Sequence, residues 1–337
     1  MMDLNILWFI LIVVLFTGFF FLEGFDYGVG ILMPFLSPHD KERTLILRTI
    51  APVWDGNEVW MITAGGALFA AFPHVYATMF STFYIALFLM LLALIFRGVA
   101  FELRSKEACA CWHKLWEGAI FFGSALPAFL WGVAVTNLLR GLPISEKMIY
   151  LGSFWDLLSL YTILGGLAFF FVFAFHGAAF LSLRIRHGGL LLRIQALARP
   201  IGLLAIIAFL FCMLLTWSST DLFKSPLAAA ALVGAALVFV IGYVCMLSRR
   251  FLPSFIASSL AIALTTIAFF AGLFPRLMVS SLQPDWSLTI YNAASTPYTL
   301  TIMSIAAGCL VPIVLIYQIW TYWIFRKRIS LNDLEQH

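Results

Sequence analysis

The stretch Ile6-Leu-Trp-Phe-Ile-Leu-Ile-Val-Val-Leu-Phe-Thr-Gly-Phe-Phe-Phe21 decides the fold, because it holds no charged residue and Thr17 is its only polar side chain. A helix that crosses the hydrocarbon core of a bilayer needs about 20 mostly apolar residues. The preceding Met1-Met-Asp-Leu-Asn5 has no positive charge, and no small-residue cleavage signal follows it. We therefore expect a retained membrane helix and not a signal peptide.

Composition extends this conclusion to the whole chain. Of its 337 residues, 63% are hydrophobic and only 11% are charged, whereas soluble domains are about 45–50% apolar and about 25% charged. No polar stretch is long enough to enclose a soluble core. The sequence predicts an all-α polytopic membrane protein that forms a single transmembrane domain over residues 1–337. The net charge of +4 comes from short loops and does not indicate a nucleic-acid partner.

Apolar runs between basic or proline-containing breaks predict about nine transmembrane helices. The expected spans are 6–35, 48–73, 75–98, 115–138, 157–183, 200–219, 226–247, 254–274 and 299–325. The second span is the weakest of them, since it contains Asp55, Asn57 and Glu58.

The distribution of basic residues supports this number of spans. Fifteen lysines and arginines fall in connections on one side and four on the other, while Arg97 lies inside the third span. Short cytoplasmic loops are enriched in Lys and Arg. We therefore expect the N-terminus outside and the C-terminus in the cytoplasm.

Four acidic residues lie inside the first two expected spans. Glu23 and Asp26 are three positions apart in the first span, and so are Asp55 and Glu58 in the second. Residues at this spacing share a helix face. At 1.5 Å per residue, Asp26 and Asp55 both lie about 15 Å from the inner membrane surface, so the two acidic pairs are expected to meet at one depth.

Ionisable groups in lipid are costly, with insertion scales giving about 2.5–3.5 kcal/mol each, so they usually have a function. A low dielectric disfavours the charged form of a carboxyl group and would let these acids hold or pass protons. The alternative is an internal polar network in which Arg97 pairs with an acid and fixes the packing. Arg97 and Glu102, at the end of the third span, leave the membrane on the same side.

The histidines and cysteines offer little for a cofactor. Only His176 lies well inside a span, and a single buried histidine cannot support a multi-haem protein. A hydrogen-bonded structural role is the simpler interpretation of His176, although it is the one weak candidate for a haem ligand. Five cysteines lack the partners and spacing of a metal site or a redox disulfide, and we expect no bound metal.

Two motifs resemble subunit II of the cytochrome bd-type quinol oxidases. The first is Glu23-Gly-Phe-Asp-Tyr-Gly-Val-Gly30, and the second, more specific, is Ile50-Ala-Pro-Val-Trp-Asp-Gly-Asn-Glu-Val-Trp60. Phe96-Arg-Gly-Val-Ala-Phe-Glu-Leu-Arg-Ser-Lys106 is similar as well. The connection at about 218–226 is shorter than in other members of this family.

The resemblance implies a fold and a division of labour. Subunit II has two four-helix bundles and one peripheral helix, which places a first bundle at about 1–140 and a second at about 157–337. Two b-type haems and one haem d lie in subunit I, which oxidises quinol and reduces dioxygen to water. Subunit II is haem-free and supports haem assembly. The expected partners are subunit I, a small single-helix accessory subunit, lipid and quinone, in a bacterial or archaeal cell membrane.

The resemblance also implies roles for individual residues. Asp26 and Asp55 match acids of a cytoplasmic proton path, with Asp55 as the central relay and with Glu23 and Glu58 secondary. Arg97, Glu102 and Asn57 are the expected polar partners of these acids. Trp54 and Trp60 are placed on an oxygen path or at the contact with the partner subunit.

A second class of function uses the same acidic cluster in a proton-coupled secondary transporter. Such folds often consist of repeated halves with broken helices near the midplane. The polar residues here are concentrated in the first three spans, which favours the oxidase subunit. A third possibility, a haem protein in its own right, depends on His176.

Overall fold

The computed structural model describes residues 3–334 and is almost entirely helical. The α-helices are α1 (Leu4–Leu36), α2 (Asp40–Arg48), α3 (Trp54–Ala71), α4 (Pro73–Thr82), α5 (Tyr84–Leu103), α6 (Ala110–Arg140), α7 (Leu160–Arg184), α8 (Gly188–Ser219), α9 (Pro226–Leu247), α10 (Phe251–Leu273) and α11 (Pro297–Ile324). Short 3-10 helices occur at η1 (Arg104–Lys106), η2 (Phe154–Leu157), η3 (Leu222–Lys224), η4 (Pro284–Trp286) and η5 (Leu331–Leu334).

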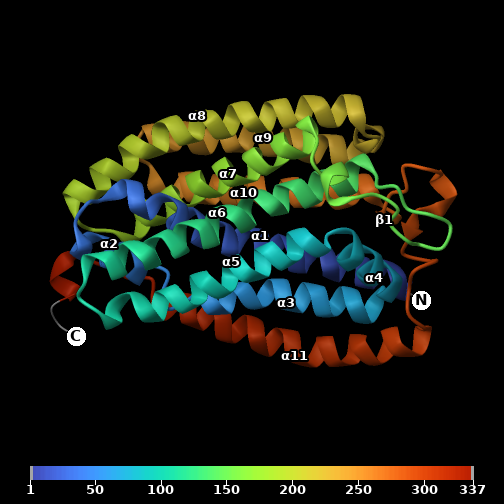
Figure 1. Ribbon diagram of the computed structural model, residues 1–337, viewed down its shortest axis with the longest axis horizontal. Helices are drawn as coiled ribbons and strands as arrows, with labels where there is room; N and C mark the ends of the chain where they lie inside the picture. The colour runs from blue at the N-terminus through green and yellow to red at the C-terminus, as the bar shows by residue number, and fades with distance from the viewer. Residues whose placement is uncertain (1–2, 335–337) are drawn as a thin grey trace.

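Eight of these helices are long and apolar enough to cross a membrane, namely α1, α5, α6, α7, α8, α9, α10 and α11. Helix α3 has 18 residues, but its polar first turns lower its hydropathy. It runs alongside the other long helices in the same bundle (Figure 1) and packs on α1. The two ends of the chain lie at opposite ends of the molecule. The prediction of an all-α polytopic membrane protein is confirmed.

Three expected boundaries were wrong. The second span does not begin at residue 48, because residues 49–53 form turns around Pro52 and α3 begins only at Trp54. The third span is divided into α4 and α5 at Phe83. The sixth does not begin at Pro200, which lies inside α8. Proline is tolerated within membrane helices when neighbouring groups satisfy the freed backbone.

The helices pack in two groups around α1. Helices α3, α5 and α6 form one group with α1, while α7, α8, α9 and α10 form the other, and α1 also contacts α7 and α10. Glycines allow the central contact, since a Cβ at Gly28 of α1 would lie 2.8 Å from the Cα of Gly177 in α7. Small residues at such crossings let backbones approach closely in lipid.

Helix α11 packs on α1 and α3, although it follows α10 in the chain. Within the described residues only Leu300 of α11 is buried. Leu300 joins the hydrophobic core, and two hydrogen bonds tie the same part of the helix to α1: the Trp8 indole donates to the Leu300 carbonyl at 3.2 Å and to the Ser304 hydroxyl at 3.1 Å. Helix α11 is therefore a peripheral element, held by a few apolar side chains and a few specific hydrogen bonds.

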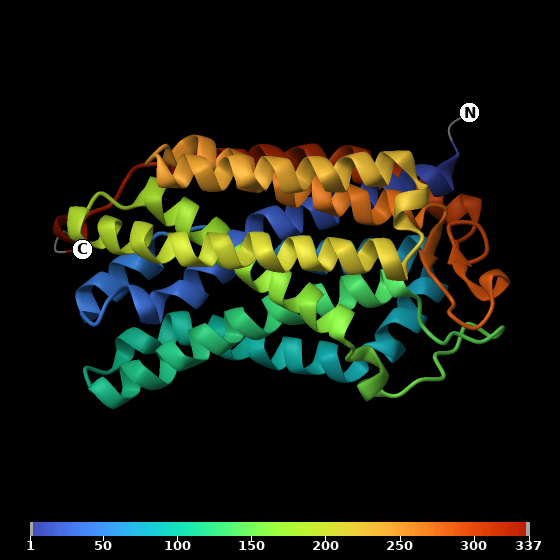
Figure 2. The ribbon, with the colours of Figure 1, turned by 90° about the horizontal axis from the view of Figure 1, so that it is seen from above.

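The end of the molecule that holds the N-terminus carries the long connections. Residues 141–159 and 274–296 lie side by side there (Figure 2), joined by a bridge between Leu142 and Ser280. The two-stranded sheet of β1 (Arg276–Met278) and β2 (Leu288–Thr289) belongs to the second of them.

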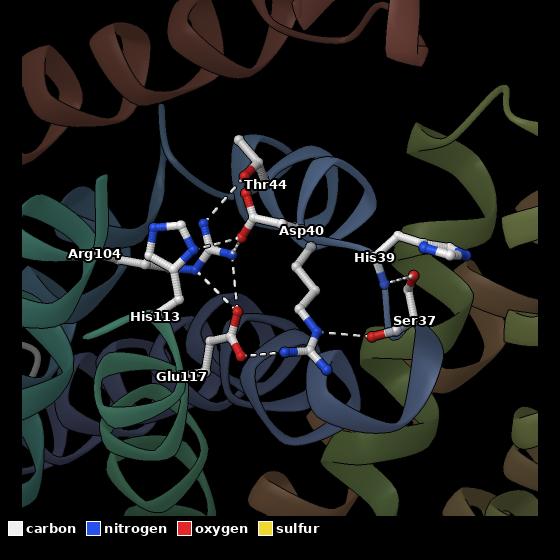
Figure 3. A network of polar contacts seen from close by, with 8 residues as sticks. Ser37, His39, Asp40, Thr44, Arg104, His113 and Glu117 are labelled. Atoms are coloured by element: carbon white, nitrogen blue, oxygen red, sulfur yellow. Dashed lines mark hydrogen bonds and ion pairs between the residues drawn. The ribbon is translucent and has the colours of Figure 1, made fainter. Parts of the chain in front are cut away.

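The opposite end is organised by α2, a short helix that the sequence analysis placed partly in a loop. Glu117 of α6 accepts from Arg43 of α2 and from Arg104 of η1, and Arg104 also reaches Asp40 (Figure 3). His113 lies 2.9 Å from Asp40. This ion-pair network ties α2 to α5 and α6 directly before α3 begins.

Glu42 anchors the other side of α2. Its carboxylate accepts from Ser37 and, at 2.5 Å, from Arg193 of α8, and His187 lies 3.4 Å away. Burial alone would raise the pKa of Glu42, but the Ser37 hydrogen bond, Arg193 and His187 outweigh burial and hold that pKa below its usual value. The carboxylate is therefore charged near neutral pH and fixes α2 against α8.

Candidate functional site

The candidate site is a polar cluster in the middle of the first helix group. Glu23 and Asp26 of α1 and Arg97 of α5 are completely buried. Glu58 of α3 is partly buried, with 18% of its side chain exposed. The cluster is thus surrounded by apolar helices that position each charge within the chain.

Arg97 connects two of the acids. Its Nη1 pairs with Glu23 and lies 3.0 Å from Oε1 of Glu58. The guanidinium also lies over the Tyr27 ring, 4.9 Å from its centroid. Arg97 does not leave the membrane at the helix end, as the sequence suggested, because its side chain turns inward to this pair of carboxylates. Arg97 thus lies beside Glu23 and Glu58, and its role in the site stays a prediction.

Asp26 meets an amide and not another acid. The Asn57 side chain donates to Asp26 Oδ2 at 2.6 Å. The Asn57 oxygen accepts from the Tyr322 hydroxyl at 2.8 Å and lies 3.4 Å from the Gln318 amide nitrogen. Helix α11 therefore supplies the side chains that hold Asn57, the partner of Asp26.

Asp55 lies apart from the other three acids. Its side chain is exposed on the outer face of α3, whereas Asn57, two residues later, is buried. Two positions correspond to about 200° around a helix, so the two side chains point in nearly opposite directions. The expectation that both acidic pairs meet face to face was wrong for Asp55. Glu102 is exposed as well, near the end of α5.

The two tryptophans of α3 occupy different environments. Trp60 donates to Gln318 Oε1 at 2.8 Å, and its ring fills the space beside Gly18 of α1. Trp54 is half-buried against the Phe101 ring, with centroids 4.8 Å apart. Trp60 therefore fixes α3 against α1 and α11, while Trp54 packs on α5.

His176 is used by the protein itself. Its Nδ1 lies 2.7 Å from the Ser258 hydroxyl and its Nε2 lies 3.2 Å from the Phe21 carbonyl. The ring stacks on Phe255 with a 4.8 Å centroid distance. Both ring nitrogens have partners, so the hydrogen-bonded interpretation fits this geometry. Across residues 3–334 no three His, Cys, Asp or Glu side chains gather as a metal site.

Sequence reasoning missed Tyr27, Gln318 and Tyr322. Gln318 and Tyr322 are four positions apart and face α3 from a mostly apolar helix, so a polar pair at this spacing was the available signal. Their partner Asn57 is more than 250 residues away along the chain, and no local pattern predicts that pairing.

A large apolar cavity of about 650 Å³ lies on the side of the first helix group toward the N-terminal end. Its lining includes Phe16 and Phe20 of α1, Phe69 of α3, and Phe83 and Leu87 beside or within α5. The polar cluster is absent from this lining. The cavity and the acids are therefore separate features of the same helix group.

Comparison with known proteins gives one consistent result. The family described as cytochrome bd terminal oxidase subunit II matches residues 4–325. The chain is similar to cytochrome bd ubiquinol oxidase subunit 2 of Bacillus subtilis (strain 168), with 43% identity over 335 residues and 99% of each chain covered. It is similar to cytochrome bd-I ubiquinol oxidase subunit 2 of Escherichia coli (strain K12), with 37% identity over 369 residues, 99% of this chain and 97% of the relative.

A solved structure shares the fold. A chain of the bd oxidase from Geobacillus thermodenitrificans aligns with a TM-score of 0.78 and 19% identity, covering 97% of this chain and 100% of that one. With the family match over nearly the whole length, this chain belongs to the cytochrome bd terminal oxidase subunit II family.

Proposed function

We propose that the chain is the haem-free subunit II of a membrane-bound quinol oxidase that reduces dioxygen to water. It supports haem assembly in the larger subunit and supplies a proton path from the cytoplasmic side. The names of its relatives, which are ubiquinol oxidase subunits, support the reaction. Family membership also favours this function over a proton-coupled transporter.

The buried acidic cluster is the observation that carries the proton path. Glu23 Oε2, Asp26 Oδ1 and the Tyr27 hydroxyl are buried without a protein hydrogen-bond partner. Buried polar groups are normally satisfied by protein or by ordered water, so these atoms suit a hydrated site. Arg97 offsets part of the negative charge, and Asn57 holds Asp26 in place.

The outward position of Asp55 gives it a different role from the one first expected. A carboxylate facing lipid costs about 2.5–3.5 kcal/mol on insertion scales. We place the larger subunit over this face of α3, where Asp55 would exchange protons between the two subunits. Trp54 lies at the same level as Asp55, at the contact with the larger subunit, whereas Trp60, which packs on α1 and α11, is left to the oxygen path.

The remaining partners follow from the same assignment. The two b-type haems and haem d belong to the larger subunit, and this chain stabilises their binding there. Quinol is the substrate of the complex. The end that carries α2 faces the cytoplasm, which leaves the N-terminus outside and the C-terminus inside. A small single-helix subunit, lipid and quinone complete the proposed surroundings.

The test uses the purified complex reconstituted in vesicles, with quinol turnover and proton uptake measured for Asp26→Asn and Asp55→Asn. Glu107→Gln, an exposed acid at the same end of the molecule, is the matched control. Normal haem content with loss of turnover and uptake in both aspartate variants supports the path. Normal turnover in both would refute it, and loss of haem would assign the residues to assembly.

A further inference from the structure

Four arginines converge where the ends of α7 and α11 meet, outside the acidic cluster. The backbones of the two segments are bridged: Arg186 N donates to the Ile329 carbonyl at 2.9 Å, and Ile329 N donates to the Arg184 carbonyl at 2.8 Å. These bonds bring Arg184 and Arg186 of one segment beside Arg326 and Arg328 of the other. Both segments lie at the end of the molecule that holds the C-terminus (Figure 1).

Three of the guanidinium groups each donate one hydrogen bond to a backbone carbonyl of the two segments. Arg184 donates to the Phe325 carbonyl, and Arg328 donates to the Leu183 carbonyl at 3.1 Å. Arg326 donates to the Trp323 carbonyl at 2.5 Å and lies 4.5 Å from the centroid of the Trp323 ring. A guanidinium has five N–H donors, so most donors remain available, and the buried Nε of Arg184 has no protein partner.

The positive charge of this cluster is not balanced by carboxylates, unlike that of other arginines at the α2 end of the molecule. Arg43, Arg104 and Arg193 each pair with a carboxylate. In the part of the chain that the structure describes, none of the four clustered arginines forms an ion pair within 4.0 Å.

Among residues 3–334, Asp333 is an acid on which the charge of Arg186 acts. Hydrogen bonds from the side chain and backbone of Ser330 hold the pKa of Asp333 below its usual value, and the charge of Arg186 adds to that effect. One carboxylate near Arg186 does not balance four arginines, so the described part of this site is net positive and would favour an anion.

We propose that this α7–α11 arginine cluster binds the phosphate group of an anionic phospholipid. Guanidinium groups match phosphate oxygens in a bidentate geometry, and basic pockets between membrane helices on the cytoplasmic side bind anionic lipid headgroups. Trp320 and Trp323, exposed at 56% and 60%, lie beside the cluster, with exposed Ile316 and Ile319 further along α11. These side chains suit the interface and the acyl chains of the same molecule.

The site would stabilise the part of α11 that reaches the polar cluster. Tyr322 lies one helical turn before Arg326, and its hydroxyl bonds Asn57. Because α11 buries little of its own surface, a lipid joining its end to α7 would hold Tyr322 against Asn57. Delipidation would then lower the activity of the complex without removing its haems.

The experiment compares phospholipid retention and binding in the purified two-subunit complex. Arg184→Gln/Arg328→Gln removes two charges from the cluster, and Arg249→Gln/Arg250→Gln removes two from the α9–α10 turn as a matched control. Native mass spectrometry counts co-purified phosphatidylglycerol, and delipidated complex is titrated with phosphatidylglycerol or phosphatidylcholine. At about 1 kcal/mol per basic residue, the cluster variant should bind phosphatidylglycerol roughly 30-fold more weakly.

The outcomes separate a built site from general surface charge. Loss confined to the cluster variant, with partial recovery in Arg184→Lys/Arg328→Lys, supports the proposal. Equal loss in the α9–α10 control, equal binding of phosphatidylcholine, or unchanged retention in the cluster variant would overturn it. Haem absorbance and helical circular dichroism verify assembly, and because binding is read directly, the result is independent of the proton path.

Discussion

Replacing Arg97 with glutamine tests the central electrostatic claim about this chain. The guanidinium is completely buried and pairs with Glu23, also completely buried, and with Glu58. Removing one partner of a buried ion pair costs about 3–5 kcal/mol, since the other charge stays uncompensated. Arg97→Gln leaves two carboxylates without their cation. We therefore expect a loss of stability at the upper end of that range, near 5 kcal/mol.

The second substitution separates charge from packing. Glu23→Gln leaves Arg97 paired with Glu58 and should cost less than Arg97→Gln. In the double variant Glu58 is the one carboxylate that has lost a direct contact with Arg97, and its side chain is partly exposed, while Asp26 keeps its hydrogen bond from Asn57. The double variant should therefore be more stable than Arg97→Gln alone, with a coupling free energy of roughly 1–3 kcal/mol.

The assay is unfolding of the purified complex in mixed micelles titrated with dodecyl sulfate, followed by helical circular dichroism, with haem absorbance as the measure of assembly. Arg140→Gln, at the exposed end of α6, is the control and should change stability by less than about 0.5 kcal/mol. A cost below about 1 kcal/mol for Arg97→Gln, or strict additivity of the two substitutions, would contradict the buried pairing.

Three further predictions follow from individual contacts. Asn57→Leu removes the donor that holds Asp26 and should lower turnover about tenfold with haem content unchanged, since leaving a buried hydrogen-bonding group without its partner costs about 1–3 kcal/mol. Normal turnover would exclude this role. Gly123→Ala should impair assembly, because its Cβ would lie 2.5 Å from Arg97 Cβ, whereas Gly118→Ala on the same helix has open space and should express normally. Glu42 has a lowered pKa in the folded chain. Its stabilising effect should therefore be complete above about pH 4.3, the ordinary glutamate pKa, and should be lost as the pH falls below that value through the folded pKa. The free energy of unfolding of wild type and Glu42→Gln, measured from pH 7 to pH 3, should differ near neutral pH and converge at the acidic end.

The sequence predicted the membrane helices well, because a spanning segment is recognised by one local property, its unbroken apolar length. The predictions failed where apolar length does not decide the structure, as in a short polar helix or at a proline inside a spanning helix. Residues 40–47 are too polar to span and lie in the connection between the first two expected spans, yet residues 40–48 form α2, which ion pairs with η1, α6 and α8 stabilise. Pro200 looked like a boundary because proline ends most helices in water, a rule that is weaker in lipid.

The site was predicted only as far as helical spacing allows. Spacing placed Glu23 with Asp26 on one face of α1, and the structure buries both. It could not fix the rotation of α3, since this helix carries polar residues around Asn57 on several faces. Which side chain turns inward depends on α11, and residues 57 and 322 meet only in the folded chain.

The orientation of α3 links the two halves of the proposed proton path. Asn57 faces inward to Asp26, and Asp55 faces outward, about 3 Å apart along the helix axis and about 200° around it. A lone chain in lipid would leave Asp55 against hydrocarbon, at a cost that insertion scales place near 3 kcal/mol. Coverage of this face by the larger subunit removes that cost and brings an ionisable group to the boundary between the subunits. The same short segment of α3 would then serve both the internal cluster and the interface, so Asp55→Asn should alter proton uptake while Asp26 and Asn57 keep their hydrogen bond.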